Sequence, residues 1–154
     1  MNPYSTEAHT LAAMGKTNWA SPLISQLERQ GKHSAILWVI QIVRNLLFEQ
    51  KPSEIETYLA WLTELEQIVQ KEQFTDIPLI EKKGKSIFSS PKVKGTFSVL
   101  ISRLFGAEGY FRLDKYELYK RFLWDILDQI NDHFSSEQIP RYQSIIRQFL
   151  TLTA

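Results

Sequence analysis

The stretch from Ser34 to Gln50, SAILWVIQIVRNLLFEQ, decides the fold that we expect for this chain. It is apolar around most of a helical turn, and only Gln41, Arg44 and Asn45 interrupt the apolar residues, on one narrow side. A helix of this kind is either covered by other helices or lies in a membrane. A membrane span needs about 20 apolar residues, and Arg44 falls within this shorter stretch. We therefore expect the central helix of an all-α, single-domain helical bundle.

Composition limits the class of protein. The chain has 154 residues, of which 44% are hydrophobic and 12% aromatic, as in one ordinary globular domain. It has no cysteine, which excludes disulfides, a thiol nucleophile and thiolate metal sites and favours the reducing cytosol. No basic segment followed by an apolar run occurs near its beginning, so we expect neither a signal peptide nor a membrane anchor, and a cytoplasmic location.

Start and stop residues divide the rest of the chain into further helices, which gives a bundle of six to seven. Serine–proline pairs predict starts at Ser21 and Ser90, capping pairs at Ser53 and Asp114, and a proline at Pro140, while a weak pattern indicates a short helix from Thr6 to Met14. Glycines predict the ends of three of these helices, at Gly15, Gly31 and Gly106. Between them the segment QFTDIPLIEKKGKSIFSS loses the helical period and contains Pro78 and Gly84. We expect a mobile basic loop at about 73–90.

Charge is distributed unevenly, although the net charge is only +1. Glu49 to Glu81 carries −6, and the adjacent Lys82 to Ala107 carries +6 with no acid. The cations of this second segment form what we call the basic block: Lys82, Lys83, Lys85, Lys92, Lys94 and Arg103. Phe88 and Phe97 are interleaved with them, and the unpaired amides of the helix expected from Ser90 would add positive potential. The block predicts a phosphate-binding surface; hydrated lysines without a ligand are the alternative.

Motifs typical of enzymes are missing from the sequence. There is no GxSxG, P-loop, GxGxxG or HExxH, and the three histidines lie far apart. We therefore expect no catalytic activity, no cofactor, no small-molecule substrate and no metal site. Three acidic residues share one side of a helix and could hold a divalent cation, although such a set is more often a solvated face: Asp125, Asp128 and Asp132.

A small all-helical chain with a phosphate-attracting basic block, no catalytic motif and no cysteine resembles the small subunits of CRISPR effector complexes. It is most similar to the version that corresponds to the C-terminal segment of the type I-D large subunit and is made from an internal start. The opening NPYSTEAHTLAAMGKTNW resembles the interior of a longer chain, as such a start would require.

The resemblance implies several copies of the chain beside other subunits of a protein–RNA complex, in contact with RNA or DNA backbone. Base pairing reads the sequence in such complexes, while the protein holds backbone and shape. The basic block would supply these contacts, and Lys120 and Arg121 a second strip.

A helical protein–protein adaptor without a nucleic-acid role is the competing hypothesis. Its acidic helix from Glu54 to Glu72 would bind a basic partner, and its basic block an acidic one. Nucleic-acid binding weakens steeply with salt, whereas an adaptor binds its partner with a defined stoichiometry. The sequence leaves this choice open.

Overall fold

The computed structural model describes residues 2–31, 33–71, 77–89, 95–136 and 138–153. All regular structure in these residues is helical, which confirms the expected all-α class, and the number of helices is eight rather than six to seven. The helices are α1 (Pro3–Ala13), α2 (Ser21–Gln30), α3 (Ser34–Gln50), α4 (Ile55–Gln70), α5 (Ile77–Phe88), α6 (Thr96–Arg112), α7 (Tyr116–Phe134) and α8 (Arg141–Thr153).

The expected central helix is α3, which has the predicted bounds and packs against α2, α4, α6 and α7. Its buried residues are Ala35, Ile36, Trp38, Val39, Ile40, Ile42, Val43, Leu46 and Leu47. Its polar side is closed by local contacts: the Gln41 amide donates to Asn45 at 2.9 Å, and Arg44 forms a 3.2 Å ion pair with Glu66 of α4. The apolar pattern therefore predicted both the helix and the direction of its one polar side.

The loop expected at about 73–90 is wrong for residues 77–88, which form α5. Ile80, Gly84 and Ile87 are buried at helical spacing, so the segment has an apolar stripe after all. Pro78 is tolerated because it lies in the first turn, where no intrahelical amide bond is lost. Gly84 lies inside the helix and faces α6, where a side chain would crowd its neighbours.

Gly106 does not end α6, which continues to Arg112. The Cβ of any other residue at this position would lie 3.0 Å from the Phe122 ring of α7. Gly106 thus allows close helix packing. In the sequence, a glycine with this role looks the same as one that ends a helix. By contrast, Gly15 and Gly31 follow α1 and α2 at or near the expected ends.

Three expected side-chain caps do not form. Ser21 is the first residue of α2, and Ser53 donates its hydroxyl to Glu54 at 2.6 Å instead of capping α4. Asp114 has a φ of 59° and accepts the Tyr116 hydroxyl, so its backbone is not in the extended conformation that a cap uses. An unexpected cap starts α1, where the Asn2 side chain accepts the amides of Tyr4 and Ser5.

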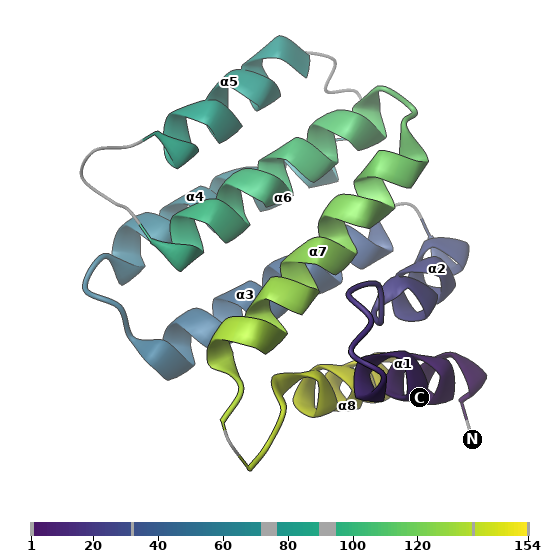
Figure 1. Ribbon diagram of the computed structural model, residues 1–154. Helices are drawn as coiled ribbons and strands as arrows, with labels where there is room; N and C mark the ends of the chain where they lie inside the picture. The colour runs from purple at the N-terminus through teal and green to yellow at the C-terminus, as the bar shows by residue number, and fades with distance from the viewer. Residues whose placement is uncertain (1, 32, 72–76, 90–94, 137, 154) are drawn as a thin grey trace.

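The helices stack in an order that leaves α5 at one edge of the molecule (Figure 1). α6 lies between α5 and α7, α4 and α3 lie behind them, and α1 and α8 pack together at the opposite end. No helix in the described part of the chain is both long and apolar enough to cross a membrane. Lys82 and Lys85 of α5 and Arg103 of α6 are exposed.

Candidate nucleic-acid interface

The basic block is divided between two helices. Lys82, Lys83 and Lys85 lie on α5, and Arg103 lies on α6. Lys92 and Lys94 lie outside the described residues. The four described cations therefore do not gather at the start of one helix. The start expected at Ser90 lies outside the described residues, and α6 begins at Thr96.

The three α5 lysines point in different directions, because successive residues of a helix are turned by about 100°. Gly84 faces α6, so Lys83 and Lys85 flank it on opposite sides and Lys82 points outward. Lys83 forms a 3.3 Å ion pair with Glu64 of α4. This pair joins the basic block to the acidic helix, and it leaves Lys82 and Lys85 as the exposed lysines of this helix.

Lys85 and Arg103 come together in a groove of about 360 Å³ that runs over α6 between α5 and α7. We call it the basic groove. Its residues are Glu81, Gly84, Lys85, Ser102, Arg103, Gly106, Gly109, Tyr110 and Phe122. Two cations from separate helices thus share one surface depression with two aromatic side chains.

Small residues form the floor of the basic groove and fix its shape. The Ser102 hydroxyl donates to the Gly84 carbonyl at 2.7 Å, which fastens α5 to α6. Ser102 therefore faces α5. Gly106 admits the Phe122 ring, which meets Tyr110 edge to face at a centroid distance of 5.0 Å.

The electrostatics of the basic groove depend on a few groups. Arg103 donates to the neutral side chain of Gln129 at 2.7 Å. Glu81 lies one helical turn before Lys85 in the same groove and offsets one of the two cations. A phosphate bound between Lys85 and Arg103 would gain two charge-assisted contacts, and a base could lie against Tyr110 or Phe122.

The aromatic residues singled out from the sequence are not those of the groove. Phe97 is buried between Tyr58 and Phe134, with ring centroids 5.5 Å from each, so it belongs to the core. Phe88 is 64% exposed near the end of α5. Tyr110 and Phe122 were missed because they come from different helices, and no linear spacing relates them.

Lys120 and Arg121 lie on α7, where the second strip was expected. Lys120 forms a 3.4 Å ion pair with Glu117 and lines a separate pocket, described below. Arg121 is exposed. Lys120 and Phe122 are two positions apart and line different pockets, so α7 separates Lys120 from the basic groove.

The three α7 aspartates do not form a metal-binding group. In the described residues no three His, Asp or Glu side chains gather closely enough to hold a metal ion. Asp128 instead accepts the indole N–H of the buried Trp19 at 3.1 Å. Burial raises the pKa of the Asp128 carboxyl, and the nearby Asp132 raises it further.

No protein-family model matches the chain, and comparison with curated proteins and with solved structures gave no match.

Proposed function

We propose that this chain is a non-catalytic subunit that binds the backbone of RNA or DNA through the basic groove. It works in a multi-subunit ribonucleoprotein of the CRISPR effector kind, beside other subunits and copies of itself. The observation that carries the proposal is the meeting of Lys85 and Arg103, from two helices, next to Tyr110 and Phe122. Cations hold phosphates without reading sequence, and aromatic rings stack on any base.

The test compares variants that remove positive charge inside and outside the basic groove. Lys85→Gln and Arg103→Gln together remove the two groove cations, whereas Lys83→Gln removes a cation that Glu64 already pairs. We expect the double variant to bind single strands and duplexes more weakly, by similar factors for unrelated sequences. Its log–log salt slope should flatten by roughly 1.4 to 1.8, at 0.7 to 0.9 for each phosphate no longer neutralised.

Two controls sharpen the experiment. Lys83→Gln should change affinity much less than Lys85→Gln or Arg103→Gln alone, each of which also removes one positive charge. Glu81→Gln should raise affinity because it removes the acid of the groove. Fluorescence anisotropy with labelled 20-nucleotide strands, measured from low to physiological salt, gives all the affinities. Equal binding by wild type and the double variant at low salt would contradict the proposal.

The protein adaptor remains the second candidate, and one observation favours it. Leu79 and Phe88 of α5 are large apolar side chains that are 51% and 64% exposed, so a partner could cover them. The acidic helix supports it less, because Glu64 and Glu66 already pair with Lys83 and Arg44 within the chain. An adaptor would lose its partner on Phe88→Ser and keep it on the double groove variant.

A further inference from the structure

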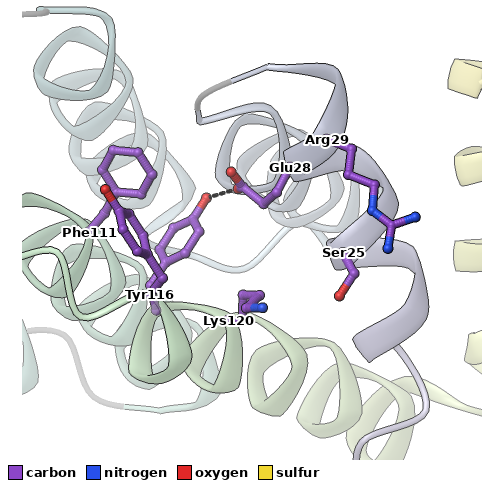
Figure 2. Close-up of a pocket in the computed structure, with 7 residues that line it drawn as sticks. Ser25, Glu28, Arg29, Phe111, Tyr116 and Lys120 are labelled. Atoms are coloured by element: carbon purple, nitrogen blue, oxygen red, sulfur yellow. Dashed lines mark hydrogen bonds between the residues drawn. The ribbon is translucent and has the colours of Figure 1, made fainter.

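A second pocket, of about 400 Å³, lies between α2 and the first turns of α7 (Figure 2). We call it the α2–α7 pocket. Its volume falls within the range of about 300 to 1,000 Å³ that is usual for small-molecule sites. It opens on the other side of α7 from the basic groove, because Lys120 lines the pocket and Phe122 lines the groove.

One wall of the α2–α7 pocket is aromatic. Phe111 packs edge to face against Tyr116 and Tyr119, with ring centroids 5.4 and 5.0 Å away, and against the His33 ring at 3.9 Å. Tyr119 is 1% exposed, whereas Tyr116 is 48% exposed. The wall is therefore backed by the buried Tyr119 ring, and the half-exposed Tyr116 offers ring surface to a planar ligand.

Glu28 of α2 stands at the inner end of the pocket, where it accepts the hydroxyl of Tyr119 (Figure 2). Burial raises the pKa of the Glu28 carboxyl, although the Tyr119 bond opposes the shift. Burial likewise raises the pKa of the Tyr119 hydroxyl, which stays a donor. Two carboxylate oxygens offer about four acceptor positions, so Glu28 can accept a further N–H from a ligand.

Two cations and a hydroxyl complete the lining. The Lys120 side chain is 27% exposed, and its partner Glu117, at 88%, is almost free in solvent, so the pair is weak. The Arg29 guanidinium lies 5.6 Å from the centre of the Tyr4 ring and donates to the Tyr4 hydroxyl. Ser25 supplies the hydroxyl. The pocket thus combines an aromatic wall, one carboxylate and two positive groups.

We propose that the α2–α7 pocket binds one nucleoside monophosphate. The base lies against Tyr116 and Phe111 and donates an N–H to Glu28. The phosphate meets Lys120 and Arg29. The nucleotide is either free or an unpaired residue of a strand, since both present the same base and phosphate.

Charge selects this class over an organic cation. An aromatic wall with a carboxylate could also hold such a cation, but Lys120 and Arg29 line the same pocket and repel it. An aromatic amino acid is the other alternative, and the test includes phenylalanine to compare it directly.

The test is an NMR titration of the full chain with AMP and GMP, with adenosine, ribose 5-phosphate, phenylalanine and tetramethylammonium as comparison ligands. We expect the nucleotides to bind more tightly than every comparison ligand and to shift the resonances of Tyr116 and Lys120. Tyr116→Ala should weaken AMP binding by roughly 5- to 100-fold, the effect of losing one base–aromatic stack, while Tyr116→Phe keeps the ring and the affinity.

A matched pair of charge variants tests the phosphate contact. Lys120→Gln should weaken AMP binding by about three- to tenfold, whereas Arg121→Gln, at the next position and outside the pocket, should leave it unchanged. If a tetranucleotide displaces AMP, the natural occupant is an unpaired residue of a strand. If it does not, the natural occupant is the free nucleotide.

The proposal does not depend on the basic groove. Lys85→Gln should leave AMP binding intact, so failure of strand binding and failure of nucleotide binding are separate results. No shift of pocket resonances at millimolar AMP, tighter binding of phenylalanine or tetramethylammonium, or equal AMP affinity of wild type and Tyr116→Ala would each overturn the proposal.

Discussion

Substitution of Gly84 tests the close contact that fastens α5 to α6. A Cβ at this position would lie 3.3 Å from the Phe105 Cβ and 3.4 Å from the Ser102 carbonyl oxygen. Both neighbours belong to or directly adjoin the α6 backbone and cannot rotate away. At Gly109 of the same interface, a Cβ would meet Glu81 and Ile80 only at 3.9 Å, an ordinary van der Waals distance.

The expected magnitudes follow from two opposing effects. Replacing a helical glycine by alanine stabilises the helix by up to about 1 kcal/mol. Gly109→Ala should keep most of this gain, about 0.5–1 kcal/mol, whereas crowding should cancel it in Gly84→Ala. Gly84→Val adds two methyl groups on a stiff side chain, and overpacking of about 1–3 kcal/mol outweighs a smaller gain in helix propensity. We expect a net loss of about 1–2.5 kcal/mol.

Urea denaturation followed by circular dichroism measures these differences, and thermal midpoints provide a second value. At this chain length, 1 kcal/mol corresponds to a shift of about 2–4 °C. Gly84→Val should also weaken strand binding, because α5 carries Lys85 into the basic groove. Equal stabilisation by Gly84→Ala and Gly109→Ala, or wild-type stability of Gly84→Val, would refute the close contact.

Three further predictions concern the core and two carboxyl groups. Ile40→Ala should cost about 2–5 kcal/mol in urea denaturation, because Ile40 is fully buried in α3, and an unchanged midpoint would contradict its central position. Burial raises the pKa of Glu28 in the folded protein, so the stability that this carboxyl contributes is lost as the pH rises above about 4.5. The thermal midpoint of Glu28→Gln should therefore rise relative to that of wild type between pH 4 and pH 7. A pH-independent difference between the two midpoints would count against the raised pKa. The hydrogen bond from Arg141 lowers the pKa of Glu49. The difference in stability between wild type and Arg141→Gln should therefore shrink as the pH falls below 4.5, and a difference that grows would contradict the lowered pKa.

The apolar periodicity of the sequence was sufficient to predict most helices. Four helices pack against α3 and bury most of its apolar residues, so its bounds could be predicted without knowing which helix lies where. Capping was predicted less well. Asp114 and Ser53 have the right residue type at the right spacing, but Asp114 has a left-handed backbone and Ser53 donates its hydroxyl to Glu54.

Glycine explains the two largest errors of the sequence analysis. Gly84 and Gly106 were interpreted as interruptions, and both lie inside helices at positions where another helix approaches closely. In the sequence, a glycine that allows close packing and a glycine that ends a helix are the same residue. Only the position of Phe105 against Gly84 and of Phe122 against Gly106 distinguishes a packing glycine from a helix stop.

The sequence by itself determined the helical class, the central helix and the presence of a basic block next to an acidic one. Tertiary structure alone decided how that block is used: Lys83 pairs with Glu64, while Lys85 joins Arg103 in a groove. It also brought Glu28 to Tyr119, 91 positions away, to form the α2–α7 pocket. The physical reason is that helical periodicity fixes which side of a helix is apolar, whereas ion pairs and pockets depend on which helix packs against that side.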